Sequence, residues 1–82
     1  MTKDKLRAAI KFATSNEQAL KESAYAGCYY CLRTYPSSEV TQFLEVERTA
    51  LCPKCGIDSV LPSNSPYELT VDTLKELNKF WF

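Results

Sequence analysis

The chain has 82 residues, in which 10 Lys and Arg are balanced by 10 Asp and Glu. This neutral balance lacks the basic excess that drives general binding to phosphate backbones. A chain this short predicts one domain whose apolar core is too small to be comfortably stable by packing alone, so we expect an additional source of stability.

Neither membrane insertion nor secretion is expected. No apolar run approaches the roughly 20 residues that span a bilayer, and the first residues, MTKDKLRAAIKFA, lack the long uncharged core of a signal peptide. A cytoplasmic location is therefore predicted. Because a reducing cytosol disfavours disulfides, an even count of four cysteines points to metal or redox chemistry.

Residues 1–26 are predicted to form a helical segment. Apolar residues recur there at a spacing close to 3.6, at Leu6, Ala9, Ile10, Ala13, Leu20 and Ala24. Thr14, Ser15 and Asn16 interrupt the pattern, and Thr14 and Glu17 have the spacing of a capping box. We therefore predict two short helices, or one bent helix, with the break near residue 14.

Short elements are expected in the middle of the chain. After Pro36, the segment SSEVTQFLEVE begins with two candidate N-cap serines and places Val40, Phe43 and Leu44 on one face, which predicts a short helix. RTALC is predicted to be a strand leading into a cysteine pair, and GIDSVL a strand leading out of it. LPSNSPYE, rich in proline and serine, is predicted to be a loop.

A helix is predicted over residues 70–82, with Thr70 as its N-cap. Its apolar stripe consists of Val71, Leu74, Leu77 and Trp81. Because Trp81 continues this stripe, we expect it to be buried. Exposing all of Phe80, Trp81 and Phe82 would be unfavourable, so these aromatics either close the core or dock a partner, with Phe82 as the candidate for exposure.

The four cysteines form two C-x-x-C pairs separated by 20 residues, at the upper end of the spacing of zinc sites. Each such turn supplies two thiolates to a tetrahedral site, and its amides hydrogen-bond to the sulfurs. Pro53 stiffens the second turn, and Gly56 can adopt the positive φ that follows it. The sequence predicts one structural Zn²⁺ per chain, bound by Cys28, Cys31, Cys52 and Cys55.

Disulfides, a redox dithiol and iron are the alternatives to zinc. A thioredoxin-like dithiol needs one pair at the start of a helix in a βαβ unit, and neither pair has that setting. Iron is the stronger competitor, because the two pairs also resemble those of rubredoxin, but helical flanks fit that strand-built protein poorly. Four protein ligands leave no place for an activated water, so the metal is expected to stabilise the fold and not to catalyse.

The cysteine pattern over residues 28–56 resembles that of zinc-ribbon and treble-clef domains, which implies a zinc-stabilised module. GCYYC, PSSEV, TALCPKCGIDSVL and the terminal KFWF are more closely similar to a family of small bacterial cytoplasmic proteins of unknown function. That resemblance implies a fold and a compartment, but no activity. The treble clef also underlies HNH nucleases, whose histidine base has no counterpart in a chain without histidine.

Other residues near the pairs have two interpretations. Tyr29, Tyr30 and Tyr35 are candidates for stacking on nucleic-acid bases, with Arg33 and Lys54 nearby. Acidic residues outnumber basic ones between residues 27 and 61, however, so packing around the metal is the favoured interpretation. Asp58 is similarly a candidate functional carboxylate, although an acid beside a turn more often caps amides or faces water.

These patterns together predict a single α+β domain over residues 1–82. A zinc-binding core, residues 27–61, forms a zinc-ribbon or treble-clef-like hairpin packed by the N-terminal segment and the C-terminal helix. The expected function is that of a non-enzymatic module that binds another protein, such as a small bacterial or phage adaptor or inhibitor. A nucleic-acid-binding zinc ribbon and a redox or rubredoxin-like iron protein are the alternatives.

Overall fold

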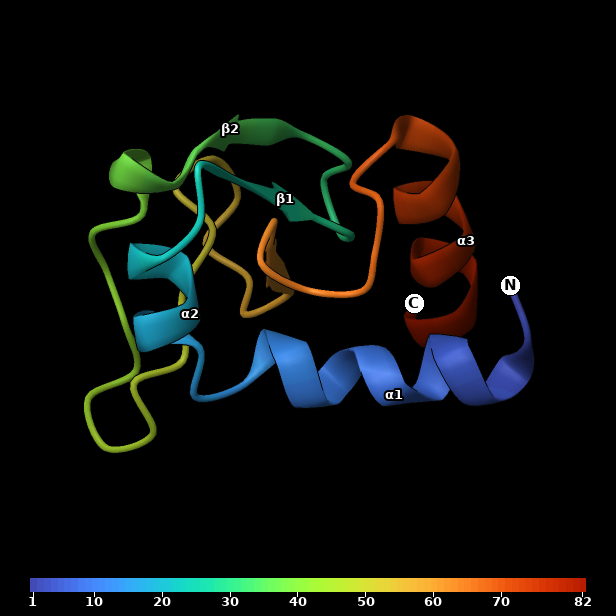
Figure 1. Cartoon of the computed structure of the whole chain (residues 1–82), viewed down its shortest axis with the longest axis horizontal. Coiled ribbons are helices and arrows are strands. Elements are labelled where there is room, and N and C mark those ends of the chain that lie inside the picture. The colour runs from blue at the N-terminus through green and yellow to red at the C-terminus, as the bar shows by residue number, and fades with distance from the viewer.

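Three α-helices and a three-stranded antiparallel sheet make up the fold, in a computed structural model that describes residues 1–82 (Figure 1). The elements in chain order are α1 (Lys3–Ala13), α2 (Glu17–Lys21), β1 (Tyr25–Cys28), β2 (Thr34–Pro36), the 3₁₀ turn η1 (Ser37–Glu39), β3 (Val60–Pro62) and α3 (Val71–Trp81). The predicted α+β class is confirmed.

The sheet has the strand order β2-β1-β3, so β1 lies at its centre. β1 pairs antiparallel with both neighbours, and Gly27 is opposite Thr34 on one side and Leu61 on the other. A Cβ at Gly27 would lie 3.3 Å from the Thr34 methyl group, a tight contact that would require the Thr34 side chain to shift by a few tenths of an ångström.

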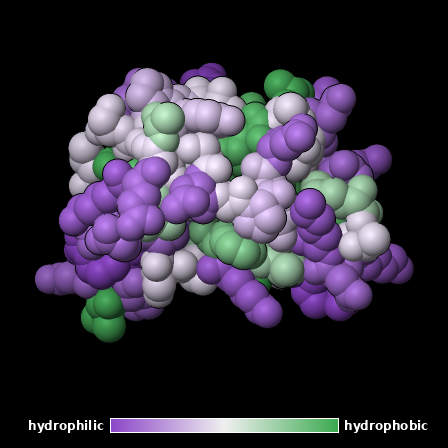
Figure 2. Space-filling model, in the orientation of Figure 1, coloured by the Kyte–Doolittle hydropathy of each residue, from purple (hydrophilic) through white to green (hydrophobic).

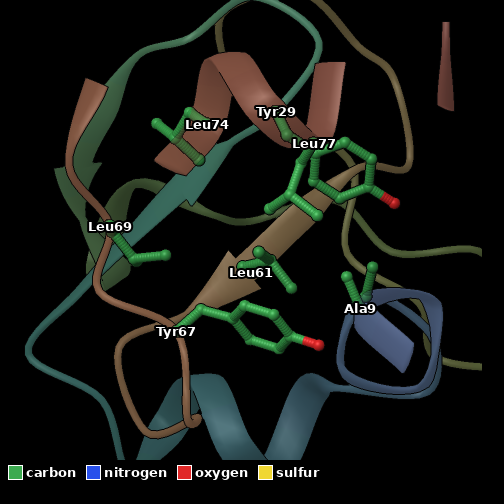
Figure 3. Close-up of a cluster of buried hydrophobic side chains, with 8 residues drawn as sticks. Ala9, Tyr29, Leu61, Tyr67, Leu69, Leu74 and Leu77 are labelled. Carbon is green, nitrogen blue, oxygen red and sulfur yellow. The ribbon is translucent and has the colours of Figure 1, made fainter. Parts of the chain in front are cut away.

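Successive side chains of a strand point to opposite sides of the sheet. Here both sides are covered, so the sheet separates two buried cores. On one face lies the helical-side core, which packs β3 against α1 and α3 (Figure 3). It comprises Ala9, Ala13, Tyr29, Leu61, Tyr67, Leu69, Leu74 and Leu77. The cysteine-side core comprises Leu20, Ala26, Cys28, Tyr35, Val40, Ala50, Cys52 and Val60. Neighbouring residues of β3, Val60 and Leu61, belong to different cores.

The break predicted near residue 14 is present, but the capping box is wrong. Thr14 ends α1 in an extended conformation, and its hydroxyl donates back to the Ile10 carbonyl. Ser15 has a positive φ of 47°, and α2 begins only after Asn16. The Asn16 side chain does not cap α2, because its amide is hydrogen-bonded elsewhere in the core.

The predicted helical segment ends earlier than residue 26. α2 stops at Lys21, and β1 begins at Tyr25. Ile10 and Ala24, which were assigned to the apolar face, are exposed. The helical pattern fails here because the chain turns into the central strand, where Ala26 and Gly27 are needed as small buried residues.

The helix predicted after Pro36 does not form beyond the single turn η1. Val40 is extended and reaches the cysteine-side core, and Phe43 forms an isolated bridge with Ala50. The strand predicted for RTALC is reduced to that bridge, and the one predicted for GIDSVL is confined to β3. The predicted loop is confirmed from Ser63 onward, while the preceding two residues belong to β3.

α3 begins where the sequence predicted, with Thr70 as its N-cap. The Thr70 hydroxyl accepts a hydrogen bond from the Thr73 amide, and Leu74 and Leu77 are fully buried. Val71 is exposed, contrary to the prediction, because Leu69 before the cap fills the core beside Leu74 as a hydrophobic staple.

The aromatic end of α3 is only partly buried. Trp81 packs against the helical-side core at intermediate exposure, which corrects the prediction of full burial, and its indole N–H donates to the Leu6 carbonyl at 3.0 Å. Phe82 is 58% exposed, as predicted.

Candidate metal centre

The first cysteine pair lies in the turn between β1 and β2. The Cys28 amide donates to the Arg33 carbonyl at 2.9 Å, and the Leu32 amide donates to the Cys28 carbonyl at 2.9 Å. These two bonds close a tight loop, the first knuckle, and Leu32 takes a positive φ of 65° within it. The loop places Cys28 and Cys31 on the same side.

The second pair lies in a knuckle with the same hydrogen bonds. The Cys52 amide donates to the Ile57 carbonyl at 2.9 Å, and the Gly56 amide donates to the Cys52 carbonyl at 2.8 Å. Gly56 has a φ of 81°, which confirms the predicted positive φ after the fourth cysteine. The two knuckles are thus equivalent in their backbone geometry.

The structure brings all four predicted cysteines together. Their sulfur atoms lie within 4.8 Å of one another, and both Cys28–Cys55 and Cys31–Cys52 are 3.7 Å apart. A tetrahedral site with metal–sulfur bonds of about 2.3 Å places its sulfurs about 3.8 Å apart. None of the four forms a disulfide. The donor set and its spacing therefore fit a tetrahedral thiolate metal site.

Backbone and side-chain donors surround the sulfurs of Cys28 and Cys52. The amide two residues after each of these cysteines donates to its sulfur at 3.4 Å. The Tyr35 hydroxyl donates to the Cys52 sulfur at 3.2 Å, and the Ser59 hydroxyl lies 3.2 Å from the Cys28 sulfur. Each hydroxyl comes from a residue that follows one knuckle, and it contacts the first cysteine of the other.

Tyr35 and Ser59 as sulfur partners were missed by the sequence reasoning, although a signal was present. Each residue follows the second cysteine of its own pair by four positions. In two knuckles with matching backbone bonds, that shared offset places both hydroxyls at equivalent points beside the cluster.

The environment of the thiols affects their ionisation differently. Burial opposes ionisation of Cys52, but hydrogen bonds from Tyr35 and from the Lys54 and Cys55 amides outweigh it and lower the pKa of this thiol to about 7. Burial raises the pKa of Cys31, and burial together with neighbouring Cys28 raises the pKa of Cys55 to about 12. Four such neighbouring groups ionise together only beside a cation, which offsets their mutual repulsion.

The tyrosines near the knuckles do not form a stacking platform. Tyr29 and Tyr35 are buried, so packing, the favoured interpretation, is correct for both. Burial raises the pKa of Tyr29 to about 12, and burial with the bond to Cys52 raises that of Tyr35, which keeps its hydroxyl a donor. Tyr30 alone is substantially exposed. Asp58 is exposed and lies outside the cysteine cluster.

The second pair is not attached to a helix. It lies in a knuckle, and the next helix, α3, begins at Val71, well after Cys55. Both pairs lie in knuckles followed by sheet strands, an arrangement like that of a zinc ribbon.

Among the helices, none has the length and apolar composition that crossing a bilayer requires.

The chain is thus defined as a small α+β domain with a four-cysteine, ribbon-like cluster that can hold a metal. Comparison with protein-family models, curated proteins and solved structures gives no match. The resemblance to zinc-ribbon sites is therefore supported by the geometry of the cluster, and the closer resemblance to one bacterial family stays a prediction.

Proposed function

We propose that this chain is a non-enzymatic, zinc-stabilised module that binds another protein. The observation that carries the proposal is the cluster of four cysteine sulfurs at tetrahedral spacing. Zinc favours this geometry and this donor set, and its usual role in a site closed by four protein thiolates is structural.

The ligand set argues against metal-dependent catalysis. Four thiolates fill a tetrahedral coordination sphere, so no position is left for water or substrate. The chain contains no histidine that could replace a thiolate or act as a base at neutral pH. A structural metal is the role that these residues support.

The packing around the cluster supports a stabilising role. Cys28 and Cys52 are members of the cysteine-side core, and Cys31 and Cys55 pack against its edge. Zinc binding to small domains contributes an apparent free energy of about 10–16 kcal/mol, which exceeds what packing supplies in a chain of this size.

An aromatic surface beside the first knuckle supports the binding role. The rings of Tyr30 and Phe82 lie edge to face with centroids 4.8 Å apart, and about half of each side chain is exposed. Asn78 holds this surface in place, because its side-chain amide donates to the carbonyls of both Tyr29 and Tyr30. Exposed aromatics on a rigid base are typical of binding hot spots. The face shown in Figure 2 carries both hydrophilic and hydrophobic side chains, and the hydrophobic ones form small separate patches.

Elemental analysis of protein purified without added metal tests the metal assignment. We expect one zinc per chain, and no free thiols in the native state. Iron in the site would give visible absorption and would establish the rubredoxin-like alternative. A folded chain with neither metal and four freely titrating thiols would contradict the proposal.

Affinity capture with Phe82→Ala tests the binding role. We expect the variant to lose the partner that the unaltered chain captures from its host. Val46→Ala is a matched control, because Val46 is an exposed apolar side chain in a different turn. Equal capture by all three proteins would remove the aromatic surface from the proposal. Capture of nucleic acid with a steep salt dependence would instead support the zinc-ribbon alternative.

A further inference from the structure

The four cysteines of the cluster differ in their exposure. The first cysteine of each pair, Cys28 or Cys52, is buried, with relative exposures of 0% and 4%. The second cysteine of each pair, Cys31 or Cys55, is only half-buried. The cluster therefore has an inner pair, Cys28 and Cys52, enclosed by the protein, and an outer pair, Cys31 and Cys55, that reagents in solution can approach.

The hydrogen bonds add a second difference between the pairs. Only the inner sulfurs are bonded to hydroxyls, Cys28 to Ser59 and Cys52 to Tyr35. A donor at a thiolate sulfur withdraws electron density from it and occupies a direction of attack, so it lowers the reactivity of that sulfur. Burial and the hydroxyl hydrogen bonds thus protect the same two sulfurs.

We propose that Cys31 and Cys55 are the sites at which hydroperoxides and soft electrophiles modify this protein, and that their oxidation releases the metal. The inference rests on the proposed zinc site and deepens it. It makes the domain sensitive to oxidants through an outer pair that is separate from the buried inner pair.

The reaction with hydrogen peroxide balances without a further reactant. The thiolate of Cys55 attacks one peroxide oxygen, which forms a sulfenic acid and releases hydroxide. The thiolate of Cys28, whose sulfur is 3.7 Å away, then attacks the Cys55 sulfur, forms a disulfide and releases a second hydroxide. Two thiolates are oxidised by two electrons, peroxide is reduced to two hydroxides, and the metal loses two ligands. Cys31 and Cys52, also 3.7 Å apart, provide the equivalent route.

Limited alkylation of the zinc-loaded full chain tests the order of attack. N-ethylmaleimide is added below one equivalent, so that only the first cysteines to react are labelled. In this reaction the thiolate sulfur adds across the double bond of the reagent, and one proton is taken up. Acid quenching and peptide fragmentation then locate the first adducts. We expect several-fold more adduct on Cys31 and Cys55 together than on Cys28 and Cys52. Even labelling, or labelling that begins on the inner pair, overturns the inference.

Peroxide-driven zinc release, followed with a chromogenic chelator, tests the protective role of the hydroxyls. Tyr35→Phe and Ser59→Ala each remove one hydroxyl bond, so we expect faster release and additional labelling of Cys52 and Cys28, respectively. Tyr25→Phe is the control, because Tyr25 is exposed and its hydroxyl contacts no sulfur, and it should match the unaltered chain. Unchanged zinc release and labelling in both variants would overturn the protective role of the hydroxyls. If Tyr35→Phe does not fold, Ser59→Ala alone provides this test.

The zinc content measured before treatment distinguishes a failure of the outer-pair inference from a failure of the proposed function. A zinc-loaded chain that labels evenly overturns only the outer-pair inference. A folded chain without zinc overturns the proposed function, whichever cysteines react first.

Discussion

Asn16 joins three parts of the chain through one buried side chain. Its amide nitrogen donates to the carbonyls of Phe12 at 3.1 Å and Val60 at 2.9 Å, and its amide oxygen accepts from the Ala50 backbone at 3.0 Å. These bonds connect the end of α1, the start of β3 and the segment that leads to the second knuckle. Because Asn16 is only 3% exposed, water cannot replace these hydrogen bonds.

We expect Asn16→Ala to reduce the free energy of unfolding by about 3 kcal/mol, because it leaves a buried amide and a buried carbonyl without partners. Urea denaturation at a fixed free-zinc concentration measures the loss. Asn64→Ala is the matched control, since Asn64 is exposed and its side chain donates only to Glu22. The control should lose less than about 0.5 kcal/mol. Similar losses for both variants would contradict a special role for Asn16.

Leu32 and Gly56 occupy the same position in the two knuckles, and both have a positive φ. A Cβ at position 56 would meet no atom within 4 Å, so a substitution there adds conformational strain without a clash. We expect Gly56→Ala to cost about 1–2 kcal/mol, the penalty for an L-residue in the left-handed region.

Gly56→Asn is the control for this strain, because asparagine tolerates the left-handed region better than alanine. The same urea measurement should show a clearly smaller loss for asparagine. Equal losses for the two variants would mean that strain at φ is not the cause.

At the scale of elements, α3 combines a hydroxyl cap, a hydrophobic staple and an indole contact at its far end. The staple pairs Leu69 with Leu74 in the helical-side core, and the Trp81 N–H donates to the Leu6 carbonyl. The buried face of the helix thus packs on β3, and its C-terminal end is bonded to α1 through Trp81.

We expect Trp81→Ala to cost about 3 kcal/mol, at the lower end for removing a packed aromatic because Trp81 is only partly buried. Phe82→Ala should cost less than half as much, since Phe82 is mostly exposed and contacts only the tyrosines of the first knuckle among aromatic rings. Thermal and urea unfolding measure both values. Equal costs would show that the whole terminus belongs to the core.

The elements that the sequence predicted correctly are those with local signals. Thr70 and the Leu74 and Leu77 spacing defined α3, and the C-x-x-C turns defined the cysteine cluster without tertiary information. β1 was missed because Ala26, Gly27 and Cys28 are all buried, which removes the alternation that marks a half-buried strand.

The helix predicted after Pro36 was wrong for a related reason. Val40 and Phe43 have a helical spacing, yet each reaches the cysteine-side core from extended or irregular backbone. Residues 42–44 pair through their backbone with residues 49–51, and the spacing of apolar side chains alone does not contain that information.

For the whole molecule, the sheet couples two cores that lie on its opposite faces. In β3, Val60 contributes to the cysteine-side core and Leu61 to the helical-side core. In and after β1, Cys28 and Tyr29 are divided in the same way. A change in the metal cluster therefore reaches α1 and α3 through adjacent residues of the same strands.

This coupling predicts that metal removal unfolds the helical layer as well as the knuckles. Trp81, the single tryptophan, packs on the helical-side core, away from the cluster, and so reports on the helical layer. During titration with a strong chelator, we expect its emission to shift to that of solvent-exposed tryptophan in proportion to the zinc released, with parallel loss of far-ultraviolet helix signal. Cys52→Ser should give the same unfolded spectra without chelator, because loss of one thiolate removes much of the binding energy. Trp81 emission that stays unchanged after all zinc has been released would mean that α1, α3 and the sheet fold independently of the metal.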